Sequence, residues 1–263
     1  MVEEKTPGTL AGSSLETRFF GQKAIYYPSL TSTMDVARDE ARKGTDAGTV
    51  VIAGEQTSGR GRMNRTWLSP KGNLAFSIVL YPEVSYLPFL VIIAALAVAH
   101  SIERATGLRT LIKWPNDILI RQKKVGGILV ESEVKRNKVL YAIVGIGINV
   151  EVNPALGESA PVLSTCLKDE IGGNILRTSL IKTILREMER LYLTLPDGKP
   201  LLQEWRDRLT TLGKTVSVYS DGTEIKGIAE SVDANGALLL RHADGSSTSI
   251  IAGDVTLREK QRE

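Results

Sequence analysis

The sequence predicts an α+β protein: a mixed, largely antiparallel sheet with helices, followed by a small C-terminal β-barrel. Three observations predict it. Two long β-branched runs, 125–134 and 139–150, are separated only by Lys-Arg-Asn-Lys and therefore form a hairpin. The apolar run 89–99 is typical of a buried helix. After Gly213, three Asp-Gly or Asn-Gly pairs indicate short strands joined by tight turns.

Length and composition describe an ordinary globular protein. The 263 residues suffice for one large domain, or a large and a small one. The net charge of +3 is too small to imply a polyanion partner over the whole surface, so any attraction for nucleotides must be local. The single cysteine, Cys166, excludes an internal disulfide and fits a reducing compartment. With two distant histidines, zinc chemistry is not expected.

No segment predicts secretion or membrane insertion. Residues 1–14 contain Glu3 and Glu4 and lack an apolar core, so they form a flexible leader and not a secretory signal. The longest apolar run, 89–99, has eleven residues, too few to span a bilayer. We therefore expect a cytoplasmic protein with no membrane partner.

The first elements are a short strand and an amphipathic helix. Residues 24–27 form the strand, and the polar stretch from Ser29 offers several helix N-caps. Met34, Ala37 and Ala41 then share one helical face, before a stop at Gly44.

Next comes a strand, a loop and a second strand. Residues 49–56 are rich in β-branched side chains and lead directly into the loop 56–67. The second strand, 73–81, alternates between two sets of side chains, as expected of a strand with two different faces.

The loop 56–67 has the composition of an anion-binding site. Between residues 56 and 82 there is no Asp or Glu, whereas four cations occur: Arg60, Arg62, Arg65 and Lys71. Gly59 and Gly61 allow backbone N–H groups to approach a ligand, and guanidinium groups suit bidentate contact with phosphate or carboxylate. A mobile, solvated basic loop is the alternative interpretation of these residues alone.

The middle of the chain alternates helix and strand. Pro88 starts a helix that covers at least 89–104, and a strand follows at 109–114. Because Pro115 cannot donate to a central ladder, Trp-Pro-Asn-Asp forms an edge or a turn from which Asn116 and Asp117 project.

Glycines interrupt both strands of the hairpin. The pairs Gly126-Gly127 and Gly145-Ile-Gly147 lie where packing alone would favour side chains, so either a ligand approaches the backbone or the glycines mark bulges. The connection 153–173 is irregular, and two helices with apolar faces follow, at 178–192 and 202–209.

Four motifs, taken together, resemble those of the biotin protein ligases. They are Gly-Arg-Gly-Arg-Met-Asn-Arg-Thr-Trp (59–67), Lys-Trp-Pro-Asn-Asp-Ile (113–118), Lys-Val-Gly-Gly-Ile-Leu-Val-Glu (124–131) and Gly-Ile-Gly-Ile-Asn (145–149). The resemblance covers roughly residues 29–150, and the β-rich tail is similar to the family's SH3-like domain. It implies the class II synthetase-like biotin/lipoate ligase fold, with a catalytic biotin- and ATP-binding domain at 15–212 and an SH3-like domain at 213–258.

The resemblance implies a two-step reaction. Biotin's carboxylate attacks the α-phosphate of ATP to give biotinyl-5′-AMP and pyrophosphate, and a lysine of a biotin carboxyl carrier protein then displaces AMP. The first step brings two anions together, so it requires fixed cations and Mg²⁺ on the phosphates. Only 28 residues precede Ser29, too few for a DNA-binding helix-turn-helix, so we expect no repressor function and no DNA partner.

Three residues are the catalytic candidates that the resemblance implies. Lys124 would bridge carboxylate and phosphate, and Arg62 would hold the biotin carboxylate and then the adenylate phosphate. Asp117 would help to deprotonate the acceptor lysine. The alternatives are a solvated hairpin lysine, like the adjacent Lys123, and an Asx-turn aspartate.

The same resemblance implies two sets of binding residues. Those for biotin are Ser32, Thr33, Gln56, Arg60, Gly61, Arg62, Lys124, Gly126, Gly127 and Gly145. Those for ATP and the adenylate are Arg60, Arg62, Arg65, Trp67, Asn116, Lys124 and Asn149. Two positions depart from the family pattern: Met34 replaces an amide, and Asn64 replaces a glycine, although Asn tolerates positive φ.

Two rival functions remain at this point. A lipoate ligase shares the fold and the adenylation chemistry, although the Lys-Trp-Pro-Asn-Asp and Gly-Arg-Gly-Arg motifs favour biotin. A nucleic-acid-binding module would use the arginines and Trp67, but the low net charge argues against it. We also expect a homodimer through the exposed hairpin 125–150, and a loop that is disordered until an anion binds.

Overall fold

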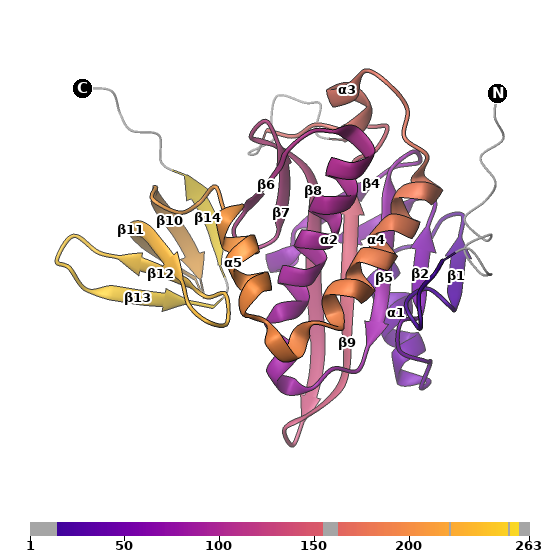
Figure 1. Cartoon of the computed structure of the whole chain (residues 1–263), viewed down its shortest axis with the longest axis horizontal. Coiled ribbons are helices and arrows are strands. Elements are labelled where there is room, and N and C mark those ends of the chain that lie inside the picture. The colour runs from indigo at the N-terminus through magenta and orange to yellow at the C-terminus, as the bar shows by residue number, and fades with distance from the viewer. Residues whose placement is uncertain (1–14, 155–162, 221, 252, 258–263) are drawn as a thin grey trace.

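The computed structural model describes residues 15–154, 163–220, 222–251 and 253–257. The leader 1–14 and the tail 258–263 lie outside these ranges. A seven-stranded sheet carries the main part of the chain (Figure 1). Its strands, in spatial order, are β1 (Ala24–Tyr27), β2 (Val50–Ala53), β5 (Leu74–Leu80), β9 (Lys138–Ile148), β8 (Lys123–Lys135), β7 (Asp117–Ile120) and β6 (Thr110–Lys113). Only β1 and β2 run parallel, so the predicted mixed, largely antiparallel sheet is confirmed.

Alternate residues of the central strands enter two separate cores. On β5, Ile78 belongs to the larger core and Val79 to the smaller one, and on β9, Val144 and Ile143 divide in the same way. All seven residues of β5 are buried. The predicted two-faced alternation therefore reflects two covered faces of the strand, since a solvated face would be exposed.

One helix covers the smaller core. Helix α1 (Thr33–Arg42) begins after Ser32 and buries Met34, Ala37 and Ala41 against β2, β5 and β9, as the sequence predicted. The other face of the sheet carries α2 (Phe89–Thr106), α4 (Arg177–Tyr192) and α5 (Lys199–Asp207). The short α3 (Leu167–Ile171) and two 3-10 turns, η3 (Val84–Tyr86) and η4 (Leu195–Asp197), connect these elements.

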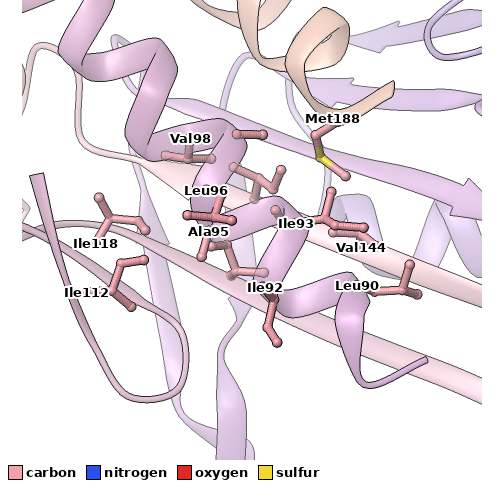
Figure 2. Packing of buried hydrophobic residues seen from close by; sticks show 14 of the residues in the cluster. Leu90, Ile92, Ile93, Ala95, Leu96, Val98, Ile112, Ile118, Val144 and Met188 are labelled. Atoms are coloured by element: carbon pink, nitrogen blue, oxygen red, sulfur yellow. The ribbon is translucent and has the colours of Figure 1, made fainter. Parts of the chain in front are cut away.

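Helix α2 is the centre of the larger core. Pro88 precedes it, and Gly107 ends it in the left-handed region at φ 71°. By length and composition alone, its 18 residues could cross a membrane. The apolar run of eleven residues in the sequence therefore underestimates the length of the helix. However, Ile92, Ile93 and Leu96 are fully buried, and they pack among strand residues and Met188 of α4 (Figure 2). The helix is a core helix.

The C-terminal part is a second, five-stranded antiparallel sheet. Its strands, in spatial order, are β13 (Ser247–Ile250), β12 (Leu238–Arg241), β11 (Thr223–Val232), β10 (Thr215–Ser220) and β14 (Asp254–Leu257). Gly222, Gly236 and Gly245 all have positive φ, so the three predicted tight turns are confirmed. The small C-terminal β unit expected from the sequence is therefore present.

The predicted loop after β2 is a small hairpin. Strands β3 (Gln56–Arg60) and β4 (Thr66–Ser69) pair with each other as a separate two-stranded sheet. The turn η2 (Arg62–Asn64) places Met63 at φ 53° and Asn64 at φ 58°. Asn64 thus adopts the positive φ expected of it, and the single strand predicted for 49–56 is divided between β2 and the start of β3.

Candidate active site

A pocket opens where the β3–β4 hairpin lies over the seven-stranded sheet. Its walls come from the start of α1, the hairpin, the turn between β6 and β7, and strands β8 and β9, and Gly253 reaches it from the C-terminal sheet. All but two of the site residues predicted from the sequence line this pocket: Ser32, Thr33, Gln56, Arg60, Gly61, Arg62, Arg65, Trp67, Asn116, Asp117, Lys124, Gly127 and Gly145. Segments that are far apart in the sequence therefore form one site.

The two exceptions lie outside the pocket. Asn149 is buried; its amide donates to the carbonyl of Thr165 at 3.0 Å, and its Oδ1 has no hydrogen-bond partner among the described residues. Gly126 pairs with Ile148 of β9, and an added Cβ would meet Ile118 of the larger core. Neither residue lines the pocket, and both assignments to the binding site stay predictions.

The positive charges of the hairpin arginines are partly compensated by other side chains. The sequence around the hairpin, which has no acidic residue, had suggested that they would not be. Arg60 Nη2 lies 2.7 Å from Glu131 Oε2 and 3.5 Å from Asp35 Oδ1. Arg62 Nη1 donates to Asn116 Oδ1 at 3.2 Å. The absence of acids between residues 56 and 82 was a correct observation, but α1 and β8 bring carboxylates from elsewhere in the chain.

Lys124 and Asp117 form the closest charged pair of the pocket. Lys124 Nζ lies 2.6 Å from Asp117 Oδ1, and the two side chains are only 25% and 16% exposed. The same ammonium lies 5.4 Å from the centre of the Trp67 ring, within cation–π range. By contrast, Lys123 is 48% exposed and pairs loosely with Glu170 at 3.9 Å. The interpretation of Lys124 as a solvated hairpin lysine is therefore wrong.

The polar end of the pocket contains an unsatisfied hydroxyl. Gln56 Oε1 accepts from the backbone N–H of Thr33 at 2.8 Å and from its hydroxyl at 3.1 Å, and Ser77 donates to Thr33 at 2.8 Å. Ser32 is fully buried, yet its Oγ has no hydrogen-bond partner among the described residues. Because buried polar groups are normally paired, Ser32 is poised for a polar ligand atom.

The glycines of β8 and β9 make room for the protein's own side chains. An added Cβ at Gly145 would lie 2.5 Å from Met34 Sδ, and one at Gly147 would collide with the Trp67 indole. At Gly127 it would lie 3.2 Å from the same indole. The sequence predicted a ligand or bulges at these glycines, whereas the close approach found there is made by side chains of α1 and β4.

Sequence reasoning missed several residues of the site. Gly147, Lys113 and Pro115 also line the pocket, although the motifs contain all three. Glu131 and Asp35 lie behind the wall and hold Arg60. Glu131 ends the motif Lys-Val-Gly-Gly-Ile-Leu-Val-Glu, which was the available signal.

Two family models match the chain. Residues 26–149 match the biotin/lipoate A/B protein ligase family, and residues 211–258 match the biotin protein ligase C-terminal domain. The first match contains the pocket strands and the hairpin. The second coincides with the C-terminal sheet.

Named relatives and solved structures agree with these matches. The bifunctional ligase/repressor BirA of Bacillus subtilis is 36% identical, over 96% of this chain and 81% of its own. The biotin–acetyl-CoA-carboxylase ligase of Mycobacterium tuberculosis is 32% identical, over 82% and 81%. The biotin protein ligase of Aquifex aeolicus, solved in complex with biotin and ATP, superposes with a TM-score of 0.77 at 28% identity, over 91% of this chain and 100% of that one. With this fold, this pocket and these relatives, the chain belongs to the biotin protein ligase family.

Proposed function

We propose that this protein activates biotin with ATP as biotinyl-5′-AMP and transfers the biotinyl group to a lysine of a biotin carboxyl carrier protein. The observation that supports it most directly is the pocket itself, which is lined by Arg62, by Lys124 and by Ser32 with its unsatisfied hydroxyl. The Aquifex relative binds biotin and ATP, and the Mycobacterium relative is named for ligation to acetyl-CoA carboxylase.

In the first step, an oxygen of biotin's carboxylate forms a bond to the α-phosphorus of ATP, and the bond to pyrophosphate breaks. We assign Arg62 and Lys124 to the charge that develops on the α-phosphate, because both line the pocket. The Lys124 ammonium would exchange its contact with Asp117 for the phosphate. Arg65, Trp67 and Asn116 would hold the adenylate, as the other lining residues of that side.

Mg²⁺ would neutralise charge on the phosphates when bound. Within the described ranges, no group of three or more His, Cys, Asp or Glu side chains could hold a metal ion. This fits the usual mode of Mg²⁺ binding, in which substrate phosphates and waters supply most of the oxygens.

Biotin's ureido ring would occupy the polar end of the pocket. The ring presents N–H and C=O groups that must be paired when buried. Ser32 Oγ has donor and acceptor capacity to offer, and Gln56 keeps its amide N–H₂ while its oxygen is bound by Thr33. Gly61 and Gly127 would line the slot with backbone. Met34 closes the slot against Gly145 with a thioether and supplies no amide.

In the second step, the acceptor amine attacks the acyl carbon of the adenylate, and AMP leaves. The amine must be neutral to attack, so it needs a proton acceptor. Asp117 lies beside Lys124, in the place where the acyl phosphate would be formed, and we assign it this role. Once Lys124 has moved to the phosphate in the first step, the Asp117 carboxylate would be free to accept the proton in the second step.

An unpaired strand edge supports the expected homodimer. The pairing of β8 with β7 ends at Gly127, whereas β8 continues to Lys135 with β9 on its other side. Such an edge is a template for another strand. We propose that a second copy pairs there, which light scattering coupled to gel filtration can measure as a doubled mass. A monomeric mass at every concentration would contradict it.

The proposed function is tested by exchange of labelled pyrophosphate into ATP. Exchange that requires biotin, followed by transfer of biotin to the lysine of a purified apo-carrier domain, is the expected result. Exchange with lipoate in place of biotin would identify the rival ligase. Salt-sensitive RNA binding without any exchange would favour the nucleic-acid-binding module, and a carrier domain with its lysine replaced is the control for transfer.

A further inference from the structure

The β3–β4 hairpin is attached to the main domain in two different ways. At its base, the backbone of Thr57 donates to Leu30 O at 2.9 Å, and Ser58 donates to Thr31 O at 3.0 Å. Farther out, in the part of the chain that the structure describes, the attachment uses side chains: Arg60 to β8, Arg62 to Asn116, and Trp67 against the glycines. The position of the outer hairpin therefore depends on side-chain contacts.

Arg60 belongs to a network of four charged groups. Its Nη2 contacts Glu131 Oε2 at 2.7 Å and Asp35 Oδ1 at 3.5 Å. Arg38 binds the same two oxygens, with Nη1 at 2.9 Å from Asp35 and Nη2 on Glu131. The two arginines and two carboxylates balance in charge, and they join α1, the hairpin and β8.

This network compensates the positive charge of Arg60. The four side chains are between 22% and 42% exposed, so solvent screens them less than a fully exposed pair. Glu131 does not line the pocket, although Leu129 on the same strand does. Its carboxylate therefore contacts Arg60 of the hairpin, although Glu131 itself does not line the pocket.

We propose that Glu131 is a positioning residue: held by Arg38 of α1, it fixes Arg60 and keeps the β3–β4 hairpin closed over the pocket. In this scheme Arg60 anchors the hairpin, while Arg62 and Lys124 bind the anionic reactants. The inference rests on the proposed function for its catalytic consequence. Its structural consequence, the position of the hairpin, is independent of any substrate.

The catalytic consequence follows from the population of closed hairpin. When only a fraction of the protein is competent to bind, the apparent dissociation constant rises by the inverse of that fraction. Loss of the Glu131 contact lowers this fraction in the free protein, and saturating biotin closes the hairpin again. The KM for biotin therefore rises, while kcat changes little.

Limited proteolysis tests the structural part without any ligand. Arg60, Arg62 and Arg65 make the hairpin a trypsin target, and cleavage tracks the population of the open form. In the substrate-free full chain, Glu131→Gln should increase cleavage within the hairpin by about fivefold to tenfold, with an unchanged Tm. Cleavage equal to that of the unaltered protein would overturn the proposal.

Glu133→Gln is the matched control. Glu133 lies on the same strand and also pairs with α1, through Arg42 at 3.6 Å, and it accepts from Tyr141 at 2.6 Å. Neither contact involves the hairpin, so its removal should leave hairpin cleavage unchanged. Equal increases in both variants would show a general loosening of β8 from α1 and would overturn the specific role of Glu131.

Steady-state exchange and a double-mutant cycle test the catalytic part. Glu131→Gln should raise the KM for biotin by about tenfold with kcat within about twofold. In an Arg60→Met background the same substitution should add little, because the two residues act as one unit. A fall in kcat at constant KM, or additive effects, would contradict the proposal. If Glu131→Gln does not fold, Arg60→Met provides the cleavage test, with cleavage compared after Arg62 and Arg65, the two arginines that remain in the hairpin of this variant.

Failure of the proposed function would be visible separately. If the unaltered protein shows no biotin-dependent exchange, the proposed function is wrong, and the cleavage comparison still decides whether Glu131 holds the hairpin.

Discussion

Lys124 and Asp117 illustrate how one contact changes the interpretation of two residues. Each was predicted from a motif, one for adenylate formation and the other for transfer. At 2.6 Å each compensates the charge of the other, so neither is an isolated charge in this partly buried site. An incoming phosphate would compete with Asp117 for the ammonium. The two proposed steps are therefore coupled through this pair.

Replacing Lys124 by Ala should reduce biotin-dependent pyrophosphate exchange by on the order of 10²–10³-fold, because a fixed cation beside the developing charge is lost. Lys123→Ala is the control, because Lys123 is 48% exposed and lies outside the pocket. Rates measured at saturating ATP and biotin should separate the two variants. Equal rates for both would show that Lys124 does not act in adenylation.

Asp117→Asn should slow transfer from preformed biotinyl-5′-AMP by on the order of 10²-fold, the usual contribution of a positioned proton acceptor. Exchange should be affected less, because the amide still fits the site. Single-turnover transfer to the carrier domain, followed as a function of pH, is the measurement. The defect should shrink as pH rises and the acceptor amine loses its proton unaided. A defect independent of pH would argue for a positioning role.

At the scale of elements, a charged cluster joins the three helices of the larger core. His100 of α2 lies between Glu187 of α4, at 2.7 Å from Nδ1, and Glu204 of α5, which bonds to Nε2. Both ring nitrogens face carboxylates. In the imidazolium form both nitrogens carry a proton, so each can donate a hydrogen bond to a carboxylate. The hydrogen bond with Glu187 raises the pKa of His100 above its ordinary value, and burial opposes it. In turn, hydrogen bonds from His100 and Arg190 lower the pKa of Glu187 to about 2.

The cluster predicts a pH window for stability. His100 has a raised pKa in the folded state, so its contribution is complete below about pH 6.5 and is lost as pH rises through the folded pKa. Glu187 has a lowered pKa, so its contribution is complete above about pH 4.5 and is lost as pH falls toward 2. Both contributions are therefore present together between about pH 4.5 and about pH 6.5. Urea unfolding between about pH 5 and about pH 9 should show falling stability.

His100→Gln should remove most of this decrease in unfolding stability with rising pH, because the glutamine amide carries no titrating charge. His242→Gln is the control: the chain has two histidines, and His242 lies half-buried on the C-terminal sheet, away from the cluster. The control should retain the dependence of the unaltered protein. Identical pH profiles for all three proteins would show that His100 is not protonated in the folded state.

At the scale of the whole molecule, the two sheets meet at the motif Lys-Trp-Pro-Asn-Asp. The Trp114 indole is buried, and its N–H donates to Gly236 O of the C-terminal sheet at 2.9 Å. The backbone beside it pairs with the segment after α5, through Ile112 and Thr210 at 2.8 Å. Asn116, two residues farther on, lines the pocket. The motif thus links the site to the contact between the sheets.

Trp114→Phe should lower the free energy of unfolding by about 1–3 kcal/mol, since the carbonyl of Gly236 loses its donor and a buried side chain shrinks. Trp67→Phe provides the comparison, because Trp67 lies at the pocket and not in the core. Guanidinium denaturation of both variants gives the measurement. A smaller loss for Trp114→Phe than for Trp67→Phe would contradict a structural role of this contact.

Local pattern in the sequence was enough to predict the elements that depend on neighbouring residues. The β8–β9 hairpin, α1, α2 and the three Gly turns follow from periodicity, capping and backbone preference, which act within a few residues. The four motifs also sufficed to indicate most of the residues that line the pocket. The separate strand β7 was not predicted, because the residues after Pro115 were interpreted as an edge or a turn.

The ion pairs of the site could not be predicted from the sequence, because the fold determines which charged residues lie close together. Arg60 and Glu131 are 71 residues apart, so no local count of charges could show that the arginine is compensated. The same is true of the hydrogen bond from the Asn149 amide to Thr165, which the motif did not indicate. Gly145 and Gly147 predicted a close approach, and the fold supplied Met34 and Trp67 as the approaching groups. Electrostatics and packing act through space, and distances between remote residues are set only by the complete fold.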